Sequence, residues 1–166
     1  MKYFLALASL FFSGCLGYQI GPAKPSVLRD VHVIAVPMFA NKTLLPRIEA
    51  VVTGTVIKQL QQDGTYRVAE EDQADAVLKA EITEVTRIPA RSVRGNVLAT
   101  AEFNLTMHVK YSLVSRSGET LMPAADVIGT TSFFVGTDPT TDERQALPLA
   151  AEELAGHLVT QLSEGW

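Results

Sequence analysis

The single cysteine of the chain, Cys15, is the side chain whose chemistry the sequence defines best. It directly follows Ser13–Gly14, and these small residues follow an apolar stretch from Tyr3 to Phe12. A cysteine that follows an apolar leader and two small residues is typical of a lipoprotein processing site. The apolar stretch is shorter than the ~20 residues of a transmembrane helix. We therefore predict that residues 1–14 are a signal peptide and that Cys15 becomes an N-terminal residue carrying diacylglycerol and an acyl chain such as palmitate. The alternative is an exported protein with an unmodified thiol.

No second group of residues has the spacing of an enzyme site. The three histidines (His32, His108 and His157) fall on different expected elements, and the acidic pair Glu152–Glu153 falls on an expected exposed helix face. The sequence has no local Ser-His-Asp signature, no glycine-rich phosphate loop and, with one cysteine, no thiolate metal site. We expect a protein without catalysis, metal or cofactor. A hydrolase whose residues converge only in space is the weakest alternative.

Three arginines form the second chemically distinctive group. Arg87, Arg91 and Arg94 lie between Glu84 and Glu102, a stretch with no acidic residue in an otherwise acidic chain. The guanidinium group binds phosphates and carboxylates through two parallel hydrogen bonds. We identify these arginines as candidates for binding an anionic lipid head group; the alternative is a solvated loop with no ligand.

The composition of the 166 residues predicts one domain behind a tether. A net charge of -4, with 14 Lys+Arg against 18 Asp+Glu, argues against general nucleic-acid binding. Residues 17–25 are rich in glycine and proline, which indicates a short linker. We predict a lipidated N-terminus and linker at 15–28 and a single domain at 29–166, with no further run long enough to span a membrane.

Apolar periodicity predicts the strands of this domain. The clearest strand runs from Ala99 to Leu113, where apolar and polar residues alternate without a break. One face of this strand should lie on the core and the other in a polar setting. The alternation from Ala74 to Ile82 changes phase near Glu84–Val85, which a β-bulge would explain. Further strands are expected at 31–36, 66–69 and 121–135, the last interrupted at Pro123.

Two helices complete the expected fold. The first should run from about Pro46 to Gln62 after a loop at 41–46, and Asp63–Gly64 should end it. The second is C-terminal, and Pro148 either starts it or lies within a longer helix that begins near Asp142. The order β-α-β-β-β-β-α predicts an α+β fold, with a mostly antiparallel or mixed sheet of four to five strands and both helices on one face.

With these elements in place, the chain resembles the lipopolysaccharide-assembly lipoprotein family (LptE-like). The resemblance begins at the cysteine, glycine and tyrosine of the processed N-terminus and continues in order through the strands, the first helix and the closing helix. The matching residues are Cys15–Gly21, Val33–Thr43, Glu49, Thr53, Tyr66–Val68, Ala74–Ile82, Leu154–Ala155, Val159, Leu162 and Trp166.

The resemblance implies a function that composition does not. Members of this family are anchored on the periplasmic side of the outer membrane, plug the lipopolysaccharide-translocating β-barrel (LptD-like), help it assemble and assist lipopolysaccharide delivery to the outer leaflet. Leu16, after the lipidated cysteine, is not the aspartate that favours inner-membrane retention. Basic residues at a loop end contact lipopolysaccharide in the family, and Arg87, Arg91 and Arg94 are the candidates here. The residues expected to face the barrel lumen are Thr100, Glu102, Asn104, Thr106, Lys110 and Ser112.

A second interpretation remains open for the tethered domain. The same architecture would serve a pilotin-like lipoprotein that assists another outer-membrane complex, such as a secretin, without contacting lipopolysaccharide. The two interpretations differ in their partner, a single large barrel or a multimeric ring.

Overall fold

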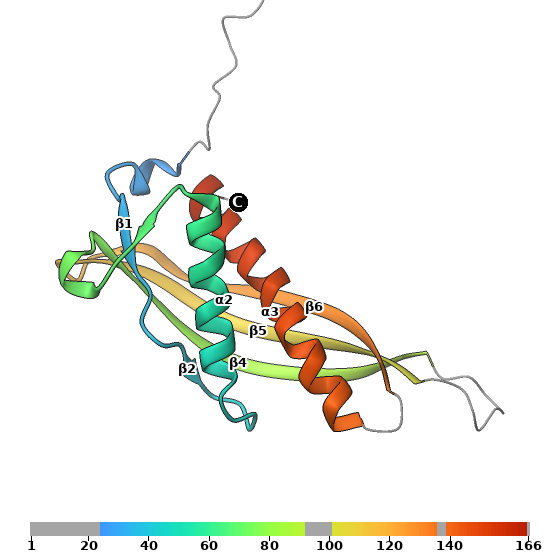
Figure 1. Ribbon diagram of the computed structural model, residues 1–166. Coiled ribbons are helices and arrows are strands. Elements are labelled where there is room, and N and C mark those ends of the chain that lie inside the picture. Colours follow the sequence, from blue (N-terminus) through green and yellow to red (C-terminus); the bar gives the residue numbers. More distant parts are fainter. Residues whose placement is uncertain (1–23, 92–100, 136–138, 166) are drawn as a thin grey trace, which may run out of the picture.

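A mixed six-stranded β-sheet and two α-helices on one of its faces form the two layers of the fold (Figure 1). The structure, a computed structural model, describes residues 24–91, 101–135 and 139–165. The predicted α+β class and the placement of both helices on one face are confirmed.

Short strands and long strands divide the sheet into two parts. The short ones are β1 (Val33–Ala35), β2 (Ala40–Asn41) and β3 (Arg67–Val68); the long ones are β4 (Ala76–Arg91), β5 (Ala101–Ser115) and β6 (Thr120–Val135). The spatial order is β3-β1-β4-β5-β6, and β2 also pairs with β4. All pairings of the short strands are parallel, whereas β4, β5 and β6 form an antiparallel meander. Two 3₁₀ turns, Ser26–Leu28 and Glu71–Gln73, flank β1 and β4.

The long strands follow the apolar alternation of the sequence. On β5, residues from Leu105 to Leu113 alternate between buried and more exposed positions, as predicted. The β4–β5 register shifts between Ile82 and Glu84, so the bulge expected near Glu84–Val85 is confirmed. The β5–β6 register also shifts near Met122–Ala125, which spans the expected interruption at Pro123. In contrast, β2 was expected to be loop, because two residues are too short a stretch to show a periodicity.

Helix α2 (Ile48–Asp63) ends as the sequence indicates. Gly64 adopts the left-handed conformation, with φ +74°, and its N–H donates to the Leu60 carbonyl at 3.1 Å. Helix α3 (Pro139–Glu164) contains Pro148 in its interior, so the longer of the two expected helices is the correct one, although it begins before Asp142.

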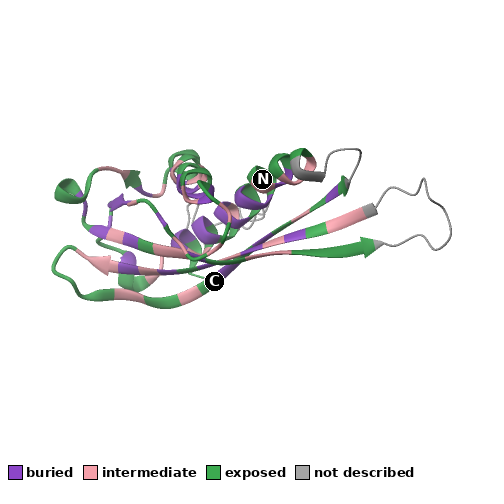
Figure 2. Ribbon diagram, turned by 90° about the horizontal axis from the view of Figure 1, so that it is seen from below, coloured by how far each residue is buried: buried purple, intermediate pink, exposed green. Residues whose placement is uncertain are grey.

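Both helices bury apolar stripes against the sheet (Figures 1 and 2). The largest completely buried side chains come from β1, α2, β4, β5 and α3 and from the segments before β1 and β3, so the core is continuous from α2 to β5 and α3. They are Tyr66, Tyr111, Leu28, Ile34, Leu60, Leu78, Ile82, Leu105, Met107, Leu113, Leu154 and Leu158. The two tyrosines keep polar partners at the helix layer: the Tyr66 hydroxyl donates to the Leu162 carbonyl at 2.7 Å, and that of Tyr111 to Gln161 Oε1 at 2.5 Å.

Helix α3 packs closely on the edge strand β6 at Gly129. A Cβ atom at Gly129 would lie 2.6 Å from Leu154 Cβ and would collide with the Ala150 carbonyl oxygen, so the helix backbone packs directly on the strand. On either side of this contact, α3 side chains bind the strand backbone. The Glu153 carboxylate accepts hydrogen bonds from the N–H and hydroxyl of Thr130, and His157 Nδ1 lies 2.9 Å from the Ile128 carbonyl oxygen.

Two carboxylates that bind backbone N–H groups should make the fold sensitive to acid. Asp75 Oδ2 accepts hydrogen bonds from the N–H groups of His32 and Val33, each at 2.9 Å, and these bonds lower the pKa of Asp75 below its ordinary value of 3.8. The N–H of Thr130 likewise lowers the pKa of Glu153 below 4.5. A folded-state pKa below the unfolded value adds stability above the unfolded pKa, and this stability is lost as pH falls through the folded pKa.

We therefore expect the thermal midpoint to fall as the pH is lowered from about 5 to about 3, and the double variant D75N/E153Q to lose less over this range. Thermal unfolding followed by circular dichroism would measure both. Parallel curves for the two proteins would contradict the assignment, because other carboxylates would then account for the acid sensitivity.

Candidate functional site

Arg87, the first of the three candidate arginines, lies towards the far end of β4 and joins the sheet to the helix layer. Its Nη1 is 2.7 Å from Glu143 Oε2 on α3, and 44% of its side chain is exposed. Its guanidinium carbon lies 5.3 Å from the ring centroid of Phe103, which stacks on Phe133 with the centroids 5.9 Å apart. Arg87 therefore has an ion-pair partner and an aromatic support, and still reaches solvent.

Of the other two candidate arginines, the structure describes the backbone of Arg91 and not Arg94. The backbone of Arg91 is paired with that of Glu102, four residues beyond Arg87 on β4, with a register shift between Pro89 and Arg91. Arg94 and the predicted lipidation residue Cys15 lie outside the described residues, as do the signal peptide and Trp166. The structure thus places Arg87 and Arg91 on the same strand, and the sequence alone groups Arg94 with them.

The sheet face opposite the helices carries the polar residues of the three long strands, together with three exposed apolar side chains, Ile88, Ile128 and Phe134. Asn104 and Lys110, predicted for this face, are exposed, and the other described members are half-buried; Thr100 lies outside the described residues. Cross-strand neighbours extend the surface. One row joins Glu81, Lys110 and Asp126, and on a second row Ser132 Oγ donates to Asn104 Oδ1 at 2.8 Å.

The loop before α2 is a polar cluster whose contacts the sequence did not predict. The Asn41 side-chain nitrogen donates to the Leu45 carbonyl at 2.8 Å and to Glu49 Oε2 at 2.9 Å. Its side-chain oxygen accepts bonds from the N–H and hydroxyl of Thr43 at 2.9 and 2.8 Å. Nearby, the buried Thr53 hydroxyl accepts the N–H of Phe39 at 3.0 Å. These contacts give a physical reason for the asparagine, threonine and glutamate of the family-like segment.

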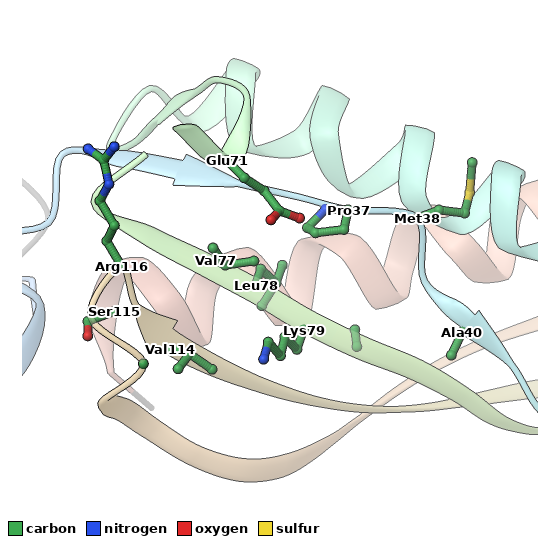
Figure 3. Close-up of a pocket in the computed structure, with 12 residues that line it drawn as sticks. Pro37, Met38, Ala40, Glu71, Val77, Leu78, Lys79, Val114, Ser115 and Arg116 are labelled. Atoms are coloured by element: carbon green, nitrogen blue, oxygen red, sulfur yellow. The ribbon is translucent and has the colours of Figure 1, made fainter. Parts of the chain in front are cut away.

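A pocket of about 510 Å³ at the β1 end of the sheet shows no catalytic arrangement (Figure 3). Its charged lining residues, Glu71, Lys79 and Arg116, come from three separate segments. No ion pair joins them in the described part of the chain. Within the same residues, no group of three or more His, Cys, Asp or Glu side chains could hold a metal ion. Nor does any described helix have the length and apolar character needed to cross a membrane.

Comparison with known families gives one match that spans most of the domain. Residues 31–162 match the model of the family described as LptE, lipopolysaccharide-assembly. No curated protein matches the chain.

Solved structures with the same fold include proteins described as lipoproteins. A minor lipoprotein from Acinetobacter baumannii has a TM-score of 0.53 and 14% identity, covering 80% of this chain and 93% of that one. A protein from Xanthomonas campestris has a TM-score of 0.54 and 12% identity, covering 81% and 85%. A proposed lipoprotein from Caulobacter crescentus has a TM-score of 0.50 and 18% identity, covering 76% and 88%. At these identities the likeness establishes the fold alone.

Proposed function

The chain belongs to the LptE lipopolysaccharide-assembly family, and from this premise we propose that it plugs and helps assemble the lipopolysaccharide-translocating β-barrel of the outer membrane. The family is one of non-catalytic lipoproteins, so the protein is not an enzyme. In the proposed role it assists the delivery of lipopolysaccharide to the outer leaflet. The observation that carries the proposal is the family match across residues 31–162, nearly the whole domain.

The polar sheet face supports this role on physical grounds. The interior of a large outer-membrane barrel is polar, so a plug needs a surface with hydrogen-bonding groups. The row of Glu81, Lys110 and Asp126 alternates acidic and basic groups across three strands. This row therefore offers both hydrogen-bond donors and acceptors to polar groups of a barrel wall. We propose this face as the surface that meets the barrel wall.

Anchoring at Cys15 would hold the domain beside its partner. Two or three acyl chains, at about 0.8 kcal/mol for each buried methylene group, keep a protein on a membrane almost permanently. The proposed location is the periplasmic face of the outer membrane. A Cys15→Ser variant that still incorporates labelled palmitate would refute lipidation at this residue.

Affinity capture of the tagged, lipidated protein from native outer membranes tests the plug role directly. We expect a large β-barrel at a ratio of about one to one. Capture of a multimeric secretin ring would instead establish the pilotin-like alternative. Capture of neither would overturn both proposals.

We also propose that Arg87, Arg91 and Arg94 contact lipopolysaccharide phosphates. Because hydrogen bonds to charged groups contribute about 1.5–3 kcal/mol each, the triple variant R87A/R91A/R94A should bind purified lipopolysaccharide at least about tenfold more weakly. Its stability should change by about 1 kcal/mol or less, since the Arg87–Glu143 pair is exposed.

The matched control removes the same charge elsewhere. Arg29, Arg67 and Arg116 are exposed and lie outside the end of β4 that carries Arg87. The variant R29A/R67A/R116A should retain lipopolysaccharide binding in the same assay. If both triple variants lost lipopolysaccharide binding to the same extent, the loss would be explained by the change in net charge, and the proposed site would be refuted.

A further inference from the structure

An open groove of about 760 Å³ separates the first turns of α2 from those of α3. A volume of this size falls in the range of small-molecule sites. Most of its lining is apolar and comes from the two helices and the loop before α2: Leu45, Pro46, Ile48, Val51, Leu147 and Pro148. The exposed side chains of Leu44 and Leu149, each next to a lining residue in sequence, extend the apolar surface at this end of the molecule.

The charges that border this groove are mainly positive. Arg47 and Arg144 line it and are exposed, and neither makes an ion pair within residues 24–91, 101–135 and 139–165. Glu143 is the acidic residue of the lining, and Arg87 already neutralises it at 2.7 Å. Two lining arginines are therefore left without a carboxylate partner, in a protein whose net charge is -4. The local charge favours an anionic group.

Arg47 is held at the groove in an unfavourable backbone conformation. With φ +67°, it is the sole non-glycine residue of the described chain with a positive φ. The left-handed region costs a residue with a Cβ atom about 1–2 kcal/mol. The Asn41 side chain fixes the preceding turn through the Leu45 carbonyl. Glycine would satisfy this backbone at less cost, so the observed arginine is better explained by its side chain than by its backbone.

The helical walls of the groove favour an acyl chain over a peptide. A peptide bound there would need partners for its own N–H and C=O groups, and unpaired buried groups cost free energy. The lining comes from α2, α3 and the loop before α2, with no residue of a strand, so a bound peptide could not pair there as an added strand. An acyl chain carries no hydrogen-bonding group and is satisfied by apolar contact alone.

We propose that this groove binds a phosphorylated acyl lipid, with the chain between α2 and α3 and the phosphate on Arg47 and Arg144. The guanidinium groups would hold phosphate oxygens through paired hydrogen bonds. The inference rests on the proposed function for the identity of the lipid, since lipopolysaccharide carries both acyl chains and phosphates. The groove is continuous with the proposed contact at Arg87 through Glu143, so the two sites would bind neighbouring parts of one molecule.

Photo-crosslinking in native outer membranes tests this inference with the full lipidated chain. Val51, on the groove wall, is replaced by p-benzoylphenylalanine, and the control carries the same group at Gln62, an exposed position at the other end of α2. We expect an adduct containing labelled lipid phosphate at Val51 and none at Gln62. In the background R47G/R144Q the Val51 adduct should fall at least about fivefold, as expected for the loss of two charged contacts.

The outcomes separate the groove from the plug role. A Val51 adduct to protein alone, no adduct, or a lipid adduct independent of the arginines would each overturn the groove proposal. R47G removes the backbone strain, so an unchanged or higher thermal midpoint for the double variant R47G/R144Q would show that a lost adduct is not due to unfolding. The same membranes are used for barrel capture. A captured barrel without a lipid adduct refutes only the groove, and a lipid adduct without a barrel refutes only the plug role.

Discussion

Replacing Gly129 with alanine is expected to lower the free energy of unfolding by about 3 kcal/mol, because the added methyl group has no space between β6 and α3. The added methyl group would collide with the Ala150 carbonyl oxygen and lie 2.6 Å from Leu154 Cβ. Neither atom can move without the backbone of α3. The helix must therefore move away from the strand. Movement of α3 would also weaken the bonds of Glu153 and His157 to β6. Chemical denaturation of the full chain would measure the change.

Gly54 provides a control in which the same substitution, glycine to alanine, should raise the free energy of unfolding. It lies on an exposed position of α2, and a Cβ atom there would have no neighbour within 4 Å. Alanine is favoured over glycine in a helix interior by about 0.8–1.0 kcal/mol, so G54A should stabilise the protein. If G129A were as well tolerated as G54A, direct packing of α3 on the sheet at Gly129 would be refuted.

Replacing Asn41 with aspartate should destabilise the protein by about 3 kcal/mol, the second large effect. The amide nitrogen that donates to Leu45 and Glu49 would become an oxygen facing the two acceptors. Buried or half-buried acceptors without a donor cost about 1–3 kcal/mol each, and the added charge increases the cost next to Glu49. The side-chain oxygen at position 41 that accepts the N–H of Thr43 would keep this hydrogen bond. Denaturant unfolding would report the difference.

The double variant N41D/E49Q tests whether this contact is responsible. Glutamine at position 49 restores a donor opposite the new carboxylate, so about half of the lost stability should return. The carbonyl of Leu45 would stay without its donor, which limits the rescue. Additive losses in the double variant would show that the two side chains do not interact.

The elements that the sequence predicted are those with a local physical cause. Gly64 ends α2 because a left-handed terminus suits glycine, and the phase change near Glu84 marks a bulge because side chains alternate along a strand. Pro148 left two helix starts open, since proline is accepted both at a first turn and, at some cost, in an interior. The buried contacts of Ala146, ahead of this proline, help to continue the helix through it.

The features that the sequence did not predict depend on the tertiary fold. The parallel pairing of β1 with both β3 and β4 joins segments far apart in the chain. Gly129 interrupts no pattern in β6, and its role is visible only once α3 lies on it. Arg47 and Arg144 meet at one groove because the helices pack together, while their separation in sequence gave no sign of it. Of the candidate site, charge spacing identified the arginines on β4 but not their ion-pair partner on α3.

The contacts of α3 with the backbone of β6 also bear on aggregation. An edge strand with free N–H and C=O groups is a template on which another chain can add a strand. At Thr130 and Ile128 the protein's own carboxylate and imidazole occupy these groups, so an incoming strand must first displace the helix. The helix thereby protects the middle of this edge from pairing with a strand of another chain.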